Sequence, residues 1–134
     1  MRFIDRSGKP PLALRKPGAQ VTQFASGATR SSDGGKLDYE GYLSPLVVKR
    51  FGEFMLKHQT QEDGKERTSD NWKKGIPKTA YLKSLLRHVV DVWLHVSGWG
   101  YKATESLEDS LCATMFNSMG LLHELLKERE RERD

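Results

Sequence analysis

Apolar residues recur at helical spacing in three stretches of the chain. In residues 44–58 they are spaced by three and four positions, and Ser44 followed by Pro45 is typical of a helix N-terminus. Residues 78–97 and 105–127 show the same period. The pattern therefore predicts three helices, and the expected fold class is all-α, a small helical bundle.

The predicted helix at 78–97 carries a line of ionisable side chains on an otherwise apolar surface. Ser84, His88, Asp91 and His95 follow one another at intervals of four, three and four residues. This spacing places them along one edge of the helix. The wide apolar surface beside this edge is expected to pack into the core, and it exceeds what one neighbouring helix can cover.

The predicted helix at 105–127 has two distinct faces. One face, of mostly large apolar residues, is expected to belong to the core: Leu107, Leu111, Met115, Ser118, Leu122 and Leu125. The other face holds small and polar residues that would let a neighbouring helix approach closely: Asp109, Ala113, Asn117, Gly120 and Glu124. Charges of alternating sign follow at 128–134 and indicate a solvated C-terminal end.

Composition divides the rest of the chain. Residues 1–35 are rich in Pro, Gly, Ser and Ala without a period, which predicts a flexible or extended basic arm. This arm is either a plain tail or a segment that orders over a partner subunit or ligand. Residues 36–127 are expected to form one helical domain. Within it, residues 59–77 form a polar loop.

The positive charge is concentrated near the N-terminus. The 134-residue chain has a formal net charge of +4, yet residues 1–36 hold seven Lys and Arg against two Asp. The remaining 15 basic and 16 acidic residues nearly cancel. This distribution argues against a folded face that binds nucleic acid and leaves open a tail that touches phosphate.

Other features of the composition favour a soluble, cytoplasmic protein. The N-terminus has no long apolar segment of the kind found in secretory signals. No uncharged stretch reaches about 18 residues, the length that a membrane span needs. The single cysteine, Cys112, cannot form a disulfide within the chain and fits a reducing compartment.

Acidic side chains at helical spacing suggest a metal site. The second predicted helix offers His88 and Asp91, three residues apart, and the third offers Glu105 and Glu108, with Asp109 next. Antiparallel helices joined by a short turn would bring these groups face to face. Carboxylates that gather in one place repel one another unless a cation lies between them. Oxygen-rich sites suit Mg²⁺ or Mn²⁺, which assist the attack of water on phosphorus.

The polar loop holds one large aromatic residue among amide and ammonium groups. Trp72 lies between Asn71 and Lys73. A tryptophan in such a loop either anchors the loop to the core or provides a surface on which a nucleotide base stacks. Both interpretations stay open at the level of the sequence.

Four stretches of the chain, in this order, carry a family resemblance. They are "SGATRSSDGGKLDYEGYLSPL" (26–46), "SDNWKKGIP" (69–77), "LLRHVVDVW" (85–93) and "EDSLCATMFNSMGLLHELL" (108–126). Together they resemble a phage-encoded family of dATP/dGTP diphosphohydrolase-like proteins. That family is similar to the MazG-type all-α nucleotide pyrophosphohydrolases, which bind Mg²⁺ through an ExxE motif and a later ExxD motif and act as dimers or tetramers.

The resemblance implies hydrolysis of a (deoxy)nucleoside triphosphate to the monophosphate and pyrophosphate, and the expected ligand is a purine (d)NTP. Glu105, Glu108 and Asp109 match the later acidic motif. His88 and Asp91 stand at the place of the earlier motif, where a full ExxE is missing. The chain departs from the family pattern at that point.

These observations lead to one set of expected site residues. The metal ligands, for Mg²⁺ or Mn²⁺, are expected to be Asp91, Glu105, Glu108 and Asp109. The catalytic residues are expected to be Glu108 and His88. The residues expected to bind nucleotide are Lys36, Asn71, Trp72, Lys73, Lys83, Arg87 and Asn117.

Two other functions compete with this hypothesis. The first is a phage protein that binds and sequesters nucleotides without turnover, which the missing ExxE would suit. The second is a helical interaction protein whose basic arm meets nucleic acid or a host partner. Both nucleotide hypotheses imply a homodimer or tetramer, and a phage origin implies the host cytoplasm.

Overall fold

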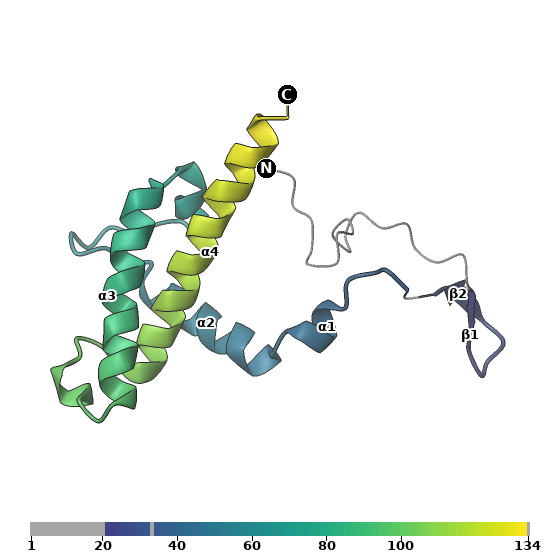
Figure 1. Ribbon diagram of the computed structural model, residues 1–134, viewed down its shortest axis with the longest axis horizontal. Helices are drawn as coiled ribbons and strands as arrows, with labels where there is room; N and C mark the ends of the chain where they lie inside the picture. Colours follow the sequence, from purple (N-terminus) through teal and green to yellow (C-terminus); the bar gives the residue numbers. More distant parts are fainter. Residues whose placement is uncertain (1–20, 33, 134) are drawn as a thin grey trace. The chain divides into compact units, whose positions relative to one another are not determined.

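The computed structural model describes residues 21–32 and 34–133, and these fall into two units. The first unit ends at Ser44 and the second runs from Pro45 to the C-terminus. The fold is all-α apart from one small hairpin (Figure 1). The predicted arm at 1–35 lies outside the described residues as far as residue 20.

The first unit contains a hairpin and one turn of helix. Strands β1 (Val21–Gln23) and β2 (Thr29–Ser31) pair antiparallel, with Val21 opposite Ser31. Helix α1 (Tyr39–Tyr42) follows, and the Asp38 carboxylate caps it by accepting a hydrogen bond from the Gly41 amide at 3.0 Å. The hairpin was not predicted, because three-residue strands have no measurable period.

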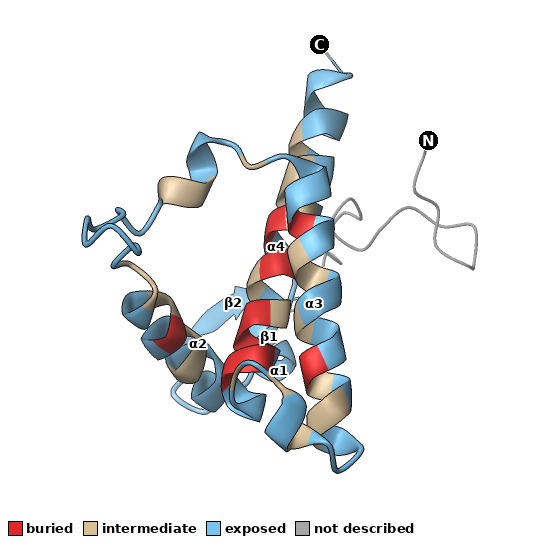
Figure 2. Cartoon of the chain, turned by 90° about the vertical axis from the view of Figure 1, so that its left-hand side faces the viewer, coloured by how far each residue is buried: buried red, intermediate tan, exposed pale blue. Residues whose placement is uncertain are grey.

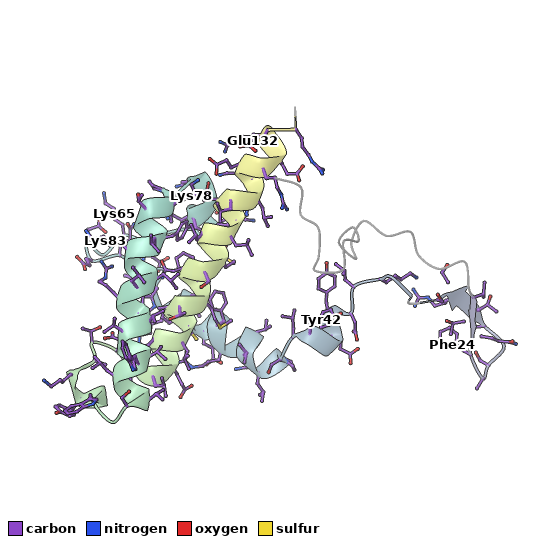
Figure 3. All side chains as sticks on the ribbon, viewed as in Figure 1. Phe24, Tyr42, Lys65, Lys78, Lys83 and Glu132 are labelled. Carbon is purple, nitrogen blue, oxygen red and sulfur yellow. The ribbon has the colours of Figure 1, made fainter. Side chains whose placement is uncertain are left out.

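None of the described residues of the first unit is buried. Phe24, Tyr39 and Tyr42 are among its exposed aromatic side chains, and Figure 3 labels Phe24 and Tyr42. An apolar side chain without neighbours contributes no burial energy to its own unit. The hairpin and α1 therefore have no hydrophobic core of their own.

The second unit contains the three predicted helices. Helix α2 spans Pro45–Lys57, α3 spans Lys78–Val96 and α4 spans Leu107–Arg131. Two 3₁₀ turns, η2 (Asn71–Lys74) and η3 (Gly100–Lys102), lie in the connections. The helices agree with the predicted ranges, except that α4 continues into the charged C-terminal residues.

Local sequence signals explain where α3 ends and where α4 begins. Gly98 has a φ of 84° just beyond α3, and the amides of Gly98 and Trp99 donate to the carbonyls of His95 and Leu94. This is the hydrogen-bond pattern of a glycine-terminated helix. Ser106 precedes α4, and its hydroxyl accepts a hydrogen bond from the Asp109 amide at 3.1 Å. The connection brings α4 back along α3 (Figure 1).

The close pairing of α3 with α4 depends on small residues. Tyr81 of α3 is almost completely buried, and its ring lies directly over Gly120 and 6.1 Å from the Phe116 ring. The predicted face of small and polar residues on α4 is buried, including Ala113 and Asn117. The prediction that this face allows a close helix approach is therefore confirmed. Figure 2 shows the buried residues in red, most of them on α4 and the others on α2 and α3.

The large apolar faces of α3 and α4 are exposed in the single chain. The prediction that these faces pack into its core is therefore wrong. Leu86, Trp93 and Val96 of α3 are exposed, and so are Leu111 and Leu122 of α4. The described apolar residues that are buried number only four: Phe54, Tyr81, Cys112 and Ala113. The faces of small and polar residues form the contact between α3 and α4. The large apolar side chains of both helices therefore point away from that contact.

Candidate metal and nucleotide site

The predicted polar stripe of α3 faces the segment that leads into α4. His88 and His95 are partly buried, and Asp91 is buried, with 7% of its surface exposed. A buried carboxylate needs hydrogen bonds or an opposite charge to offset its desolvation. The side chains and backbone of residues 104 and 105 supply contacts to this stripe.

Asp91 is held by one residue of the connection. The Thr104 hydroxyl donates to Asp91 Oδ2 at 2.5 Å, and the Thr104 amide lies 3.3 Å from the same oxygen. Both donors engage Oδ2, and no contact to Oδ1 is recorded among the described residues. The arrangement orients the carboxylate and leaves lone pairs for a further ligand.

His88 and Glu105 form the second part of the site. His88 Nδ1 lies 2.7 Å from Glu105 Oε1, and each side chain is 22% exposed. This is an ion-pair distance, but the ring N–H does not point at the oxygen, so Nδ1 lacks an aligned hydrogen-bond partner within the described part of the chain. Two atoms that approach without hydrogen-bond alignment suit joint ligation of a cation.

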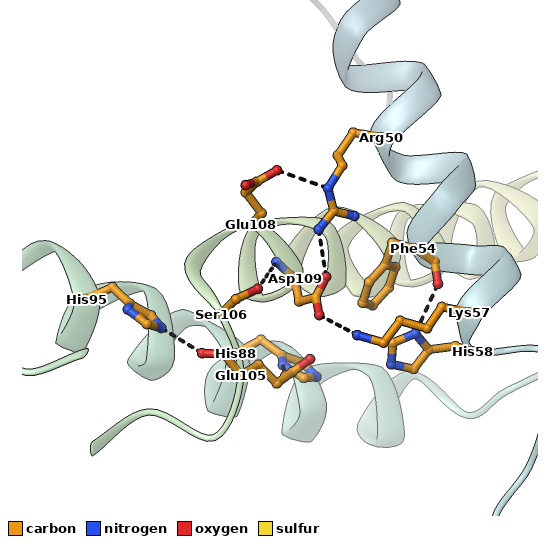
Figure 4. Close-up of polar contacts among 10 residues, drawn as sticks. All are labelled: Arg50, Phe54, Lys57, His58, His88, His95, Glu105, Ser106, Glu108 and Asp109. Atoms are coloured by element: carbon orange, nitrogen blue, oxygen red, sulfur yellow. Dashed lines mark hydrogen bonds and ion pairs between the residues drawn. The ribbon is translucent and has the colours of Figure 1, made fainter. Parts of the chain in front are cut away.

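The backbone of Glu105 is fixed from behind. His95 Nε2 lies 2.6 Å from the Glu105 carbonyl oxygen, as Figure 4 shows. His95 itself packs against Gly100, where any side chain would collide with the imidazole ring. His95 and Gly100 therefore hold the backbone of Glu105 in place, but neither is a member of the group formed by His88, Asp91 and Glu105.

His88, Asp91 and Glu105 can converge on one ion. One ligand atom from each lies within 4.8 Å of the other two. Neighbouring ligands of an octahedral Mg²⁺ or Mn²⁺ lie about 3 Å apart and opposite ligands about 4.2 Å apart, given metal–oxygen bonds of about 2.1 Å. The 4.8 Å limit is slightly longer than the distance between opposite ligands, so the three side chains would move a little closer together around one ion. One imidazole with two carboxylates also suits Mn²⁺, since imidazole is a softer ligand than Mg²⁺ prefers.

Two members of the group line a pocket of the second unit. The pocket has a volume of about 720 Å³, and both His88 and Glu105 belong to its wall. Its other walls come from α2, from the 58–76 connection and from α4. Most of the lining is apolar: Phe51, Phe54, Met55, Trp72, Ile76, Phe116 and Met119. A pocket of this size and character accommodates a small organic ligand.

Three of the residues expected to bind nucleotide lie at this pocket. Asn71 and Trp72 line it from η2, and Asn117 lines it from α4. The Trp72 ring packs edge-on against His123 at 4.9 Å, so Trp72 anchors the loop while one side still borders the pocket. Asn117 donates to the Ala113 carbonyl at 2.8 Å and keeps its amide oxygen available.

The predicted cations of the second unit, Lys73, Lys83 and Arg87, do not themselves line the pocket. Lys73 lies 5.6 Å from the Trp72 ring centroid, and Arg87 donates to the Ser84 hydroxyl at 3.1 Å. Lys83 is exposed on α3 (Figure 3). Lys36 belongs to the first unit. Within the second unit, Lys73, Lys83 and Arg87 are not members of the group formed by His88, Asp91 and Glu105.

Glu108 and Asp109 pair with cations of α2 instead of joining the group. Asp109 accepts hydrogen bonds from Lys57 Nζ and Arg50 Nη2, each at 2.8 Å, while Glu108 accepts one from Arg50 Nε at 3.0 Å (Figure 4). The ammonium of Lys57 and the guanidinium of Arg50 lower the pKa of Asp109. Asp109 therefore stays ionised within this ion-pair network.

Sequence reasoning missed several residues of this region. Arg50, Lys57 and Arg67 come close to the site, and Thr104 and His95 orient its acidic members. The spacing of Arg50 and Lys57, two helical turns apart around Phe54, could have placed them on the face of α2 that meets α4. Nothing in the sequence around Thr104 indicates its contact with Asp91.

No known protein family, curated protein or solved structure matches this chain. Among the described residues, no helix combines the length and the apolar character that crossing a bilayer requires. The argument about function therefore depends on the chemistry of the site itself.

Proposed function

We propose that the protein is a metal-dependent diphosphohydrolase that cleaves a (deoxy)nucleoside triphosphate to the monophosphate and pyrophosphate. One observation carries the proposal: His88, Asp91 and Glu105 converge at the wall of an apolar pocket. A cation held there and a base held in the pocket would fix both ends of a nucleotide. The family resemblance of the sequence supports the same activity.

Asp91, Glu105 and His88 would hold Mn²⁺ or Mg²⁺. The bound ion would neutralise phosphate charge and lower the pKa of a coordinated water. Three protein ligands leave coordination positions for phosphate oxygens and water. Thr104 and His95 would keep Asp91 and Glu105 in place, since partners of this kind strengthen metal binding.

The attack on phosphorus needs a group that accepts a proton from water. His88 is the candidate, because its Nδ1 is buried without an aligned hydrogen-bond partner among the described residues, while its side chain is 22% exposed. A ring nitrogen that binds the ion cannot also accept this proton, so His88 acts either as a ligand or as the group that orients water. Glu108 would take the catalytic role expected of it only after its ion pair with Arg50 opens.

The apolar pocket would receive the base. Its volume of about 720 Å³ leaves room for a purine and its sugar. Trp72 would contact the face of the base, and the amides of Asn71 and Asn117 would form hydrogen bonds to the base or the sugar. These contacts favour a purine (deoxy)nucleotide as the ligand.

The proposed enzyme would work as a homo-oligomer. Large apolar side chains along α3 and α4 are exposed, and only four described apolar residues are buried. A core of that size contributes too little burial energy to offset the conformational entropy of the chain. A second copy that covers these faces, in a dimer or tetramer, would supply the missing burial. Light scattering coupled to size exclusion would measure the state, and a stable monomer would contradict this part of the proposal.

Pyrophosphate release from each of the four dNTPs, with Mn²⁺ and with Mg²⁺, tests the activity. We expect release with a purine dNTP. Asp91→Asn should reduce it by about a hundredfold or more, because one charged ligand is lost. Asp63→Asn is the matched control, since Asp63 is an exposed carboxylate outside the pocket lining and its change should have no effect. Equal rates for the two variants, or no product from any nucleotide, would refute the enzymatic proposal.

A nucleotide-binding protein without turnover is the second candidate. The ion pairs of Glu108 and Asp109 favour it, because they take two acidic side chains out of the expected metal site. The three side chains that remain would bind a single ion. Calorimetry that detects binding of a dNTP, together with no product over many hours, would support this function. Product formation that depends on Asp91 would exclude it.

A further inference from the structure

Two cations of α2 converge on a single carboxylate of α4. Lys57 Nζ and Arg50 Nη2 each lie 2.8 Å from an oxygen of Asp109, and Arg50 Nε also reaches Glu108 at 3.0 Å. Arg50 and Lys57 are two helical turns apart on α2, with Phe54 between them on the same face. The helix therefore presents two positive groups, side by side, to the beginning of α4.

The burial of these groups is unequal. The Asp109 side chain is 13% exposed, whereas Lys57 is 65% exposed and Arg50 34% exposed. Ion pairs with such open partners stabilise a fold only weakly. Lys57 and Arg50 can therefore exchange Asp109 for another anion at little cost.

The two cations border the proposed active site. Asp109 lies one turn beyond Glu105, which belongs to the group with His88. Phe54 of α2 and His58, the residue after α2, line the same pocket as His88 and Glu105. Figure 4 draws the contacts of Lys57 and Asp109 in one view with the His88 and Glu105 side chains.

A triphosphate bound at the site would need more positive charge than one metal ion supplies. It carries about four negative charges at neutral pH, and each charge-assisted hydrogen bond to a cation adds affinity. Among the described residues that line the pocket, the only Lys or Arg is Arg67, which donates to the His58 carbonyl at 2.7 Å. Arg50 and Lys57 are the next cations along the wall formed by α2.

We propose that Arg50 and Lys57 bind the phosphate chain of the ligand, and that Asp109 and Glu108 hold both cations ready until phosphate replaces them. This inference rests on the proposed function, because it takes a polyphosphate chain to be the ligand. It assigns Asp109 and Glu108 the role of competing anions, in place of metal ligands.

The inference predicts opposite signs for changes on the two sides of the network. Lys57→Met removes a phosphate ligand, so affinity should fall by roughly tenfold to a hundredfold. Asp109→Asn removes a competitor, so affinity should rise several-fold. If the ion pairs only fasten α2 to α4, both changes should weaken binding. If Asp109 is a metal ligand, Asp109→Asn should reduce Mn²⁺ affinity.

The experiment is a calorimetric titration of the full chain with tripolyphosphate and with dATP, each with and without Mn²⁺. Lys49→Met is the matched control, because Lys49 is exposed on the same helix and pairs with Glu53 alone. Glu108→Gln is the second variant on the acidic side. Glu108 is 74% exposed, so its change poses little risk to folding and should also tighten binding.

The expected result is weaker binding by Lys57→Met, tighter binding by Asp109→Asn or Glu108→Gln, and no change in Lys49→Met. The same signs with tripolyphosphate and dATP locate the effect in the phosphate chain, and an effect confined to dATP would overturn the inference. Weaker binding by both acidic variants, or an unchanged affinity in Lys57→Met, would also overturn it.

The outcome is separable from that of the proposed function. Mn²⁺ binding that depends on Asp91, with phosphate affinity indifferent to Lys57, would reject the phosphate role of α2 and leave the metal site intact. Phosphate binding with the expected signs, but without any Mn²⁺ binding or turnover, would reject the enzyme and support the role of Arg50 and Lys57.

Discussion

Replacing Gly120 by alanine should loosen the α3–α4 contact that positions the site. A Cβ at position 120 would lie 2.6 Å from the Tyr81 hydroxyl oxygen and closer still to two ring carbons, whereas ordinary contact begins at 3.4 Å. Tyr81 is 1% exposed, so its ring lies in the interior of the α3–α4 contact. The ring would therefore have to retreat by about 1 Å, and α3 would have to move with it.

The expected cost follows from two opposing effects. Overpacking of a filled interior costs about 1–3 kcal/mol. Alanine is a better helix former than glycine and returns up to about 1 kcal/mol. The severe overlap at position 120 calls for the upper part of the overpacking range, about 2–3 kcal/mol, so the net loss for Gly120→Ala is about 1–2 kcal/mol, or roughly 3–8 °C in Tm. Gly52→Ala on α2 is the control, because nothing lies within 4 Å of its added Cβ. It should stabilise the protein slightly.

Urea and thermal unfolding, followed by circular dichroism at one fixed protein concentration, would measure both variants. Fixed concentration matters because association contributes to the apparent stability. Tyr81→Leu should relieve the overlap, so that Gly120→Ala costs little in that background. If Gly120→Ala behaves like Gly52→Ala, the α3–α4 contact described here is wrong.

Three further predictions concern single side chains. Thr104→Val should weaken Mn²⁺ binding by roughly tenfold, because Asp91 loses its shortest hydrogen bond; unchanged affinity would show that Thr104 does not orient Asp91. The pKa of Asp109 is lowered below 3.8, the ordinary value of an aspartate. Its ion pairs therefore stabilise the fold fully above pH 3.8, and this stabilisation is lost as the pH falls through the lowered pKa. The difference in unfolding free energy between the protein and Asp109→Asn should therefore shrink below about pH 4, and a constant difference would contradict the ion pairs. Burial raises the pKa of the Cys112 thiol, so iodoacetamide should modify Cys112 slowly until the protein unfolds, and fast modification would refute its burial.

The sequence pattern was sufficient to predict the helices but not their orientation. Apolar spacing located α2, α3 and α4 to within a few residues. Period alone could not decide which face of α3 meets α4, because its apolar surface is wide. The contact instead follows the small residues of α4, such as Gly120, which allow the closest approach of Tyr81. The large apolar faces then turn outward.

The candidate site was predicted in part for a similar reason. His88 and Asp91 are three residues apart inside α3, and helical geometry places them together. The same argument fails for Glu105 and Glu108. Helix α4 begins at Leu107, so Glu105 precedes the cap and its side chain does not follow the helical direction. Glu105 faces His88, while Glu108 faces Arg50.

Titration with Mn²⁺, followed by the loss of its free electron paramagnetic resonance signal, tests the central claim most directly. The claim is that His88, Asp91 and Glu105 hold one divalent cation. We predict one Mn²⁺ per chain in the unaltered protein, loss of binding in Asp91→Asn, and full binding in Asp109→Asn. Undiminished Mn²⁺ binding by Asp91→Asn, or no binding by the unaltered protein, would contradict the account.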